Sequence, residues 1–543
     1  MGIPRSTTKV SAVAVALVAL ALLPALWVLA SNRDIPQFGT YQDDGLFLIG
    51  AKSLSEHQGY RISNLPGEPF QTKYQPLHAL VLAAIWSING NFPGNLSLVA
   101  IYQALVFVAL IVLSALLFRS FRFSPLESAA MAAFLALSPW IIYWTTVPFS
   151  DYLFAALVAG AFVLLNRASG NRSLILAAGV AAAAAYLTKS AGLLIVPAVL
   201  IGCIRRRDWK SAGLFLIPVV PAIAGWTIWA SSHRTPSDQP ILWYYTDYVG
   251  AFLKNGGIHA LPDIVPHNLW SIMAAAGSIV VHDLPGSMLG RFLCVLIAAA
   301  MVTGGVRIVK RTGSIDYPVF CLLLAATLAL WNFSPNVRLM LPIFPLLAMG
   351  LYLEAQVLAG LIRRSLQGRD FGNRVAAYVI LIAILSGCVY GIRRNAVFIA
   401  RDTPALLQQG RESTARSRLV FAWMRASLPP SAVVLASNDT LVYLYTGRKS
   451  VRPVPNSVAF YTNDHAAMLA NFTGLDQVIG SFGITHILVS PGDYVTEFET
   501  EDRREIMRLL LENPAHKTIY SADGFTVRET EHQDTSSYRN VNR

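Results

Sequence analysis

The chain has 543 residues, of which 54% are hydrophobic and 14% are charged, and its formal net charge is +12. Soluble domains carry about 25% charged residues, so this composition excludes a purely soluble protein and predicts a membrane protein with some soluble mass. The basic residues lie in short clusters between apolar runs, which is typical of cytoplasmic loops and argues against nucleic-acid binding. The four cysteines lie inside apolar runs, at spacings too wide for a zinc motif.

The first apolar run covers residues 10–30 and follows Arg5 and Lys9. A signal peptide is the alternative, but its length of about 20 residues and the many later runs favour an uncleaved transmembrane helix. We predict further spans at residues 97–118, 126–144, 151–166, 173–188, 190–204, 211–230, 288–309, 317–333, 338–360 and 375–392. The expected fold class is a polytopic α-helical membrane protein with about 11 transmembrane helices.

One shorter apolar run, Pro76–Ile88, is too short to cross a bilayer. At 1.5 Å per residue it reaches about 20 Å, whereas the hydrocarbon layer is about 30 Å thick. We therefore expect it to be re-entrant or interfacial. Every predicted inner loop is then basic, which places the N-terminus in the cytoplasm and predicts a multi-pass protein of the inner (plasma) membrane.

The predicted topology divides the chain into three parts. A transmembrane module has two long outer loops, and it is followed by an extracytoplasmic domain and a disordered tail. The ranges are 1–392 for the module, 31–96 and 231–287 for its outer loops, 393–530 for the domain, and 531–543 for the tail.

The C-terminal domain shows alternating helix and strand patterns. Amphipathic helices are predicted for S-R-L-V-F-A-W-M-R-A-S-L and E-D-R-R-E-I-M-R-L-L-L-E-N, and buried strands for A-V-V-L-A-S and T-H-I-L-V-S. The run K-T-I-Y-S-A-D-G-F-T-V-R-E predicts a hairpin around Asp523-Gly524. These patterns predict a small α/β domain, which would bind an acceptor or a cell-wall glycan, or would cover the outer loops as a structural lid.

The first outer loop contains an acidic pair, Asp43 and Asp44, in T-Y-Q-D-D-G-L-F-L-I-G. A solvated acidic loop is one interpretation. Tyr41 and the apolar residues after the pair instead predict a short helix on the membrane, with the acids at its start, where the helix dipole favours them. Adjacent carboxylates raise the pKa of one member, which suits a general base near neutral pH; the alternative use of such a pair is to bind a divalent metal.

Four further ionisable residues are expected on the same outer side. Asp151 lies where an outer loop meets a span, and Ser150 or Asp151 could simply cap that helix. The cations Lys73, Lys189 and Arg338 could simply extend their charged ends to the interface. Three acids and three cations on one side nevertheless favour a joint functional role.

A lipid-phosphate-linked sugar is a substrate that needs both kinds of charge. The departing phosphate requires cations, and the attacking hydroxyl of the acceptor requires a carboxylate to take its proton. A single displacement of this kind inverts the anomeric centre.

In these features the chain resembles the polyprenyl-phosphate-sugar-dependent glycosyltransferases of the GT-C superfamily, and within it the branch of the protein O-mannosyltransferases and the lipid A aminoarabinose transferase. The resemblance covers roughly residues 10–360. The matching motifs are Asp43-Asp44, K-Y-Q-P-L-H-A-L-V-L-A from Lys73, Ser150-Asp151, L-T-K ending at Lys189, and R-x-x-L-P-x-x-P from Arg338. The chain departs from the family at Gln75, where a second proline is usual, at Asp151, where many relatives have Glu, and at Leu339, where an aromatic residue is frequent.

The resemblance implies a transferase without a metal cofactor, with a divalent metal as the alternative, because some relatives use one at their acidic residues. One Asp of the pair would be the general base, with Asp43 favoured, while Asp44 and Asp151 would shape the site or orient the acceptor. The donor phosphate would be held by Lys73, Lys189 and Arg338, and the candidates for lining the site are Tyr41, Tyr74 and His78. The implied partners are a polyprenyl-phosphate-sugar donor, a lipid, glycan or protein acceptor, and the membrane.

Three other functions compete with this interpretation. A transporter or flippase would place charges near mid-bilayer and have repeated halves, whereas these charges cluster at one face and no repeat is visible. An O-antigen ligase or polymerase-like enzyme would use a pyrophosphate-linked donor. A non-catalytic glycan-binding membrane protein would not need the acidic pair.

Overall fold

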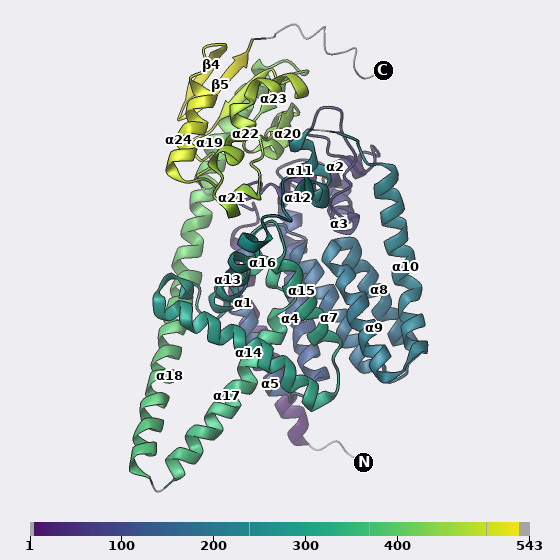
Figure 1. Ribbon diagram of the computed structural model, residues 1–543, viewed down its shortest axis with the longest axis vertical. Helices are drawn as coiled ribbons and strands as arrows, with labels where there is room; N and C mark the ends of the chain where they lie inside the picture. Colours follow the sequence, from purple (N-terminus) through teal and green to yellow (C-terminus); the bar gives the residue numbers. More distant parts are fainter. Residues whose placement is uncertain (1–4, 238, 369, 496, 532–543) are drawn as a thin grey trace. The chain divides into compact units, whose positions relative to one another are not determined.

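The computed structural model describes residues 5–237, 239–368, 370–495 and 497–531, and the chain forms two compact units (Figure 1). The helical unit contains Met1–Ile35, Ser97–Thr227 and Val265–Leu407. The mixed unit contains Pro36–Leu96, Ile228–Ile264 and Gln408–Arg543. Most of each predicted outer loop therefore packs with the C-terminal residues. The predicted tail, apart from Glu531, lies outside the described residues.

Most helices of the helical unit match the predicted apolar runs. Among the described residues of the whole chain, seven helices are long and apolar enough to cross a membrane. Four shorter apolar helices accompany them, and one of these, Pro76–Ile88, belongs to the mixed unit. The helices are α1 Arg5–Ser31, α4 Leu96–Ser120, α5 Pro125–Ala136, α6 Pro139–Trp144, α7 Asp151–Ala168, α8 Arg172–Thr188, α9 Ile195–Arg206, α10 Trp209–Ser232, α13 Leu261–Val280, α14 Met288–Thr312, α15 Asp316–Ala329, α16 Val337–Met340, α17 Phe344–Gln367 and α18 Phe371–Val397. The predicted fold class of a polytopic helical membrane protein is confirmed.

The structure differs from the predicted spans where the sequence interrupts a helix. The run 126–144 is divided into α5 and α6, because Pro139 begins a new helix and cannot continue the preceding one. The segment 231–287, expected to be a loop, contains α11 Pro240–Thr246, α12 Tyr248–Lys254 and most of α13. Polar residues and Pro266 interrupt the apolar pattern of α13, so hydropathy alone does not reveal this helix.

Helices α14 and α17 cross at a point that only glycine permits. A Cβ atom added to Gly304 would lie 2.3 Å from the Cα of Gly350, and one added to Gly350 would lie 2.1 Å from the carbonyl oxygen of Ala300. Small residues at such a crossing let two backbones approach closely, which is how helices gain packing energy in a membrane.

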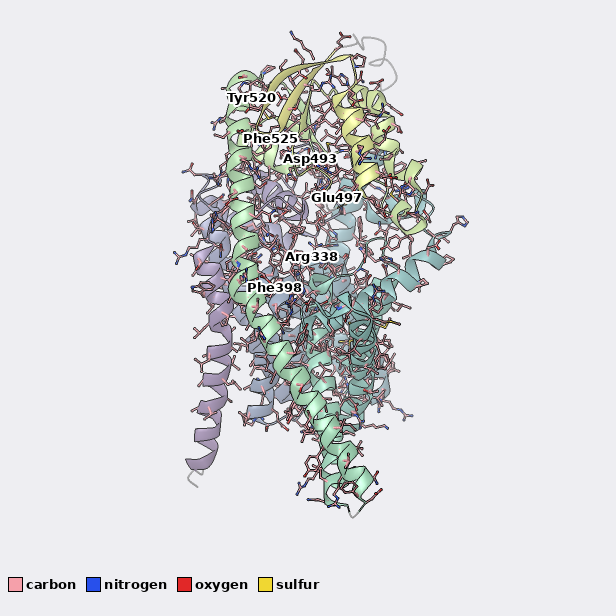
Figure 2. All side chains as sticks on the ribbon, turned by 90° about the vertical axis from the view of Figure 1, so that its left-hand side faces the viewer. Arg338, Phe398, Asp493, Glu497, Tyr520 and Phe525 are labelled. Atoms are coloured by element: carbon pink, nitrogen blue, oxygen red, sulfur yellow. The ribbon has the colours of Figure 1, made fainter. Side chains whose placement is uncertain are left out.

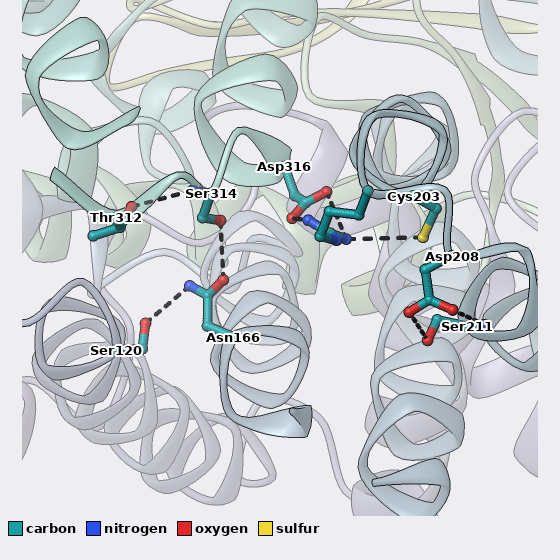
Figure 3. A network of polar contacts seen from close by, with 9 residues as sticks. Ser120, Asn166, Cys203, Asp208, Ser211, Thr312, Ser314 and Asp316 are labelled. Atoms are coloured by element: carbon teal, nitrogen blue, oxygen red, sulfur yellow. Dashed lines mark hydrogen bonds and ion pairs between the residues drawn. The ribbon is translucent and has the colours of Figure 1, made fainter. Parts of the chain in front are cut away.

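A polar network joins helix ends at the C-terminal end of α7 (Figure 3). The Asn166 side chain donates to the hydroxyl of Ser120 at 3.0 Å and accepts from the hydroxyl of Ser314 at 3.2 Å. Arg206 on α9 donates to both carboxylate oxygens of Asp316, at 2.8 and 3.4 Å. Asn166, Ser314 and the charged pair line a cavity of about 490 Å³. These bonds tie the ends of α4, α7, α9 and α15 together.

The mixed unit combines outer-loop helices with a five-stranded sheet, in the order β2-β1-β3-β5-β4 (Figure 1). Its remaining elements are α2 Asp43–Ser55, α3 Pro76–Ile88, α19 Thr403–Ser427, β1 Val433–Leu435, α20 Asp439–Thr446, β2 Lys449–Val451, α21 Ala459–Thr462, α22 His465–Thr473, α23 Leu475–Phe482, β3 His486–Val489, α24 Thr500–Leu511, β4 His516–Ala522 and β5 Phe525–Thr530. Strand β1 pairs in parallel with β2 and β3, whereas β5 pairs antiparallel with β3 and β4.

The predicted α/β character of the C-terminal residues is confirmed. The hairpin between β4 and β5 turns at Asp523 and Gly524, which have φ of 52° and 79°. Two positive φ values in a two-residue loop match the twist of the flanking strands. In Figure 2 Tyr520 and Phe525 mark this hairpin, and the ring of Tyr520 packs on Trp423 of α19 at 4.6 Å. Strand β2 has only three residues and was not predicted.

We expect Gly350→Val to lower the free energy of unfolding by about 1–3 kcal/mol, because the new side chain overpacks the α14–α17 crossing. Thermal unfolding of the detergent-solubilised protein measures this change. Gly360→Val is the matched control, because Gly360 lies on the same helix and an added Cβ would meet nothing within 4 Å. Equal melting temperatures for the two variants would show that the crossing tolerates bulk.

Candidate functional site

The acidic pair begins helix α2, as the sequence predicts. Asp43 is half-buried, and its Oδ1 accepts a hydrogen bond of 2.5 Å from the hydroxyl of Tyr74. Tyr74 lies two residues before α3, so two neighbouring helices of the first outer loop bring the phenol and the carboxylate together. The hydrogen bond fixes the orientation of the Asp43 carboxylate.

The second acid, Asp44, has a different environment because it is completely buried. Its Oδ2 accepts from the backbone N–H of Gly39 at 2.6 Å, and its Oδ1 has no hydrogen-bond partner among the described residues. Burial raises the pKa of Asp44 to about 7, with a further contribution from the charge of Asp43, while backbone hydrogen bonds oppose the shift. A simple solvated loop does not describe Asp44.

Lys73 lies beside the acids and is also buried, with 7% of its surface exposed. Its ammonium group donates to the backbone carbonyl of Tyr244 at 2.6 Å and lies over the rings of Tyr244 and Tyr74, at 4.1 and 4.8 Å from their centroids. Burial lowers the pKa of Lys73 to about 7, and the charge of Asp43 opposes this shift. Lys73 is therefore held among aromatic rings and does not extend to solvent.

The other expected lining residues lie in the same unit. The ring of His78 is completely buried and meets Phe47 edge-on at 4.9 Å, and Phe47 also packs against Tyr74 at 4.9 Å. Tyr41 is half-buried, and its carbonyl oxygen accepts a hydrogen bond from the N–H of Asp43. The mixed unit thus brings together the expected residues of the first outer loop: Tyr41, Asp43, Asp44, Lys73, Tyr74 and His78.

The helical unit brings together the other three expected residues. Asp151 is the first residue of α7, and one oxygen of its carboxylate accepts a short hydrogen bond from the ammonium of Lys189. The other oxygen lies 3.8 Å from Nε of Arg338. Asp151 and Arg338 are mostly buried, with side-chain exposures of 5% and 16%, whereas Lys189 is 28% exposed. The cations pair with a carboxylate, and the Ser150 side chain forms no capping hydrogen bond.

Local backbone geometry places these two cations. Lys189 ends α8 in an extended conformation, with φ of −155° and ψ of 136°, before a short 3₁₀ helix, Ser190–Leu194. Arg338 lies on α16 (Figure 2), whose first turn is capped by the side chain of Asn336, and its guanidinium stacks 3.9 Å from the centroid of Phe149. Two cations around one carboxylate leave an unbalanced positive charge, which suits a phosphate.

The structure places the expected residues in two clusters, one in each unit. That the clusters serve a single reaction stays a prediction. Within the described residues, no group of three His, Cys, Asp or Glu side chains could hold a metal ion. The sequence interpretation missed Gln42, which directly precedes the acidic pair. It also missed the four residues that form hydrogen bonds with the Gln42 side chain: Tyr244, Tyr245, Asp439 and Arg452. Only the position of Gln42 next to the acids could have drawn attention to it.

No protein-family profile and no curated protein matches this sequence. Solved structures are similar at low identity. The ArnT of Cupriavidus metallidurans bound to undecaprenyl phosphate has a TM-score of 0.52 and 14% identity, and the match covers 94% of this chain and 97% of that chain. The oligosaccharyltransferase of Archaeoglobus fulgidus tethered with an acceptor peptide has a TM-score of 0.54 and 12% identity, over 96% of this chain and 74% of that chain.

A third similar structure is the AglB oligosaccharyltransferase of Archaeoglobus fulgidus in complex with an inhibitory peptide and a dolichol-phosphate. Its TM-score is 0.52 at 12% identity, with 96% of this chain and 74% of that chain covered. ArnT, a lipid A aminoarabinose transferase, and AglB are both members of the GT-C superfamily. The likeness extends over nearly the whole chain and confirms the expected GT-C fold.

We expect Asp44→Asn to stabilise the protein more at pH 8 than at pH 5. The pKa of Asp44 is raised from 3.8 to about 7, so the folded state binds its proton more tightly than the unfolded state, and the carboxyl destabilises the fold as pH rises through this range. An uncharged side chain removes this loss, which is on the order of 1–3 kcal/mol between the two pH values.

Melting temperatures at both pH values measure this effect. Asp476→Asn is the matched control, because it is the same replacement at an exposed position of the same unit. A pH-independent difference between Asp44→Asn and the wild type would contradict the buried-carboxyl interpretation.

Proposed function

We propose that the chain is an integral-membrane glycosyltransferase that moves a sugar from a polyprenyl-phosphate-linked donor to an acceptor hydroxyl, on the extracytoplasmic face of the inner membrane. One observation carries the proposal. Lys189 and Arg338, expected to bind the donor phosphate, converge on Asp151 in a fold whose solved examples include complexes with undecaprenyl phosphate and dolichol-phosphate.

Asp43 is the proposed general base. Its carboxylate is oriented by Tyr74 and is only half-buried, whereas Asp44 is completely enclosed. Asp43 takes the proton of the acceptor hydroxyl while the hydroxyl oxygen bonds to the anomeric carbon. The bond between that carbon and the phosphate oxygen breaks, and its electron pair leaves with the polyprenyl phosphate. Attack opposite the leaving group inverts the anomeric centre.

Asp44 supports this role by limiting the charge of the pair. With a pKa of about 7, Asp44 is largely protonated in mildly acidic solution and about half protonated at pH 7. The pair then carries one full negative charge, on Asp43, because two adjacent carboxylates resist ionising together. Lys73 interacts electrostatically with Asp43, and its own pKa of about 7 lets it take part in proton exchange.

The donor phosphate is assigned to Lys189 and Arg338, with Lys73 as a third expected contact. Asp151 orients the first two cations, so little ordering remains when the phosphate arrives. A guanidinium and an ammonium supply charge-assisted hydrogen bonds to a leaving phosphate without a metal ion, and the proposed mechanism includes none.

Asp43→Asn should lower kcat for sugar transfer by about 100-fold or more, because the acceptor hydroxyl loses its base. The assay follows labelled sugar from a polyprenyl-phosphate donor in membranes that contain the variant. Asp34→Asn is the matched control, an exposed acid in the same loop that should keep normal activity. Full activity of Asp43→Asn would remove the assignment of Asp43 as the base.

Lys189→Ala and Arg338→Ala should each raise the KM for the donor by about tenfold to 100-fold, because each removes one charge-assisted hydrogen bond to the phosphate. Donor titrations at a saturating acceptor concentration measure this change. Arg363→Ala is the control, an exposed arginine of the same unit. An unchanged donor KM in both variants would refute the phosphate-binding role of these cations.

A further inference from the structure

The residue before the acidic pair has an unusual backbone conformation. Gln42 has φ of 61° and ψ of −47°, and the N–H of Asp43 donates to the carbonyl oxygen of Tyr41 at 2.6 Å. These values and this bond define a classic γ-turn, which is rare and strained for a residue with a side chain. A residue keeps such a conformation only where the surrounding structure holds it.

The side chain of Gln42 shows what holds the turn. It is 2% exposed, and its amide uses all four of its hydrogen-bonding positions. The nitrogen donates to the hydroxyl of Tyr245 at 3.1 Å and to Oδ1 of Asp439 at 3.2 Å. The oxygen accepts from the hydroxyl of Tyr244 at 3.0 Å and from the guanidinium of Arg452 at 3.2 Å.

The four groups around Gln42 are themselves fixed, and we call them the Gln42 clamp: Tyr244, Tyr245, Asp439 and Arg452. The two tyrosines come from α11, in the second outer loop, and the two charged residues come from the C-terminal domain. Oδ2 of Asp439 accepts from Tyr245 and from Asn64, both at 2.7 Å. Arg452 also pairs with Glu497, labelled in Figure 2.

Close packing of two helices supports the same contact. The first turn of α2, which carries the acids, lies against the first turn of α20, which begins with Asp439. A Cβ atom added to Gly45 would lie 2.3 Å from the hydroxyl oxygen of Thr440. The backbone of the acidic helix and the C-terminal domain therefore approach as closely as a glycine allows.

We propose that Gln42 and Asp439 are positioning residues: through the Gln42 clamp, the second outer loop and the C-terminal domain hold the strained turn that orients Asp43 and Asp44. The effect on catalysis rests on the proposed function, whereas the clamp itself is a property of the fold. If the turn relaxed, Asp43 would lose its alignment with Tyr74, and Asp44 would lose the N–H of Gly39. The C-terminal domain then does more than cover the outer loops.

Hydrogen exchange on the full-length protein tests the clamp without any substrate. Gln42→Gly tolerates the positive φ but lacks the amide, so it separates the side-chain clamp from backbone strain. We expect about tenfold faster exchange of the amides in residues 39–47 for Gln42→Gly and for Asp439→Asn, with unchanged exchange in α24. Asp476→Asn, an exposed acid of the same domain, is the control. If these amides exchanged as slowly in Gln42→Gly as in the wild type, the proposal that the Gln42 side chain holds the turn would be overturned.

Transfer kinetics test the positioning role. In Tyr245→Phe and Asp439→Asn, kcat should fall at least about tenfold while the donor KM stays within twofold, because the base is misaligned while Lys189 and Arg338, which lie in the helical unit, are untouched. The acid limb of the pH–rate profile should also move, which a merely structural residue would not cause. If the variants showed a wild-type kcat although the amides of residues 39–47 exchanged faster, the proposed positioning role would be refuted. A wild-type protein without transfer activity would instead refute the proposed function, and hydrogen exchange would still decide the clamp.

Discussion

An ionised side chain beside a hydrocarbon layer is stable only when another charge or a hydrogen-bonding group offsets its lost hydration. The chain satisfies this constraint in two ways. Asp151 is paired with two cations, Lys189 and Arg338, and this arrangement keeps a net positive charge. Asp44 and Lys73 are buried, and burial moves their pKa values towards 7 from opposite directions. The first arrangement suits a phosphate, and the second suits proton exchange near neutral pH.

The acidic pair depends on distant parts of the chain for its position. Gln42 meets Tyr245 and Asp439, which are 203 and 397 residues away. Such contacts place part of the proposed active-site support in the C-terminal domain, where neither composition nor motif marks it. A strained turn lowers the stability of the fold. The four hydrogen bonds of the buried Gln42 amide can hold this turn in one conformation.

Hydropathy and local patterns predicted most elements of the fold. The long apolar runs became helices, the acids began α2, and Asp523-Gly524 formed the hairpin turn. Prediction failed where tertiary contacts override local signals: α13 has polar interruptions, and β2 has three residues that gain their strand partner only in the sheet. The pairing of Lys189 with Asp151 spans 38 residues, so spacing suggested a shared side but could not reveal the ion pair.

The most direct test of the central claim is the fate of a labelled sugar on a polyprenyl-phosphate donor, supplied to membrane vesicles that contain the wild-type protein and acceptor molecules. A glycosyltransferase predicts that the label leaves the polyprenyl phosphate and appears on an acceptor hydroxyl, with the anomeric configuration inverted. A label that crosses the vesicle membrane still attached to its lipid, with no new glycoside formed, would contradict the account and indicate a flippase.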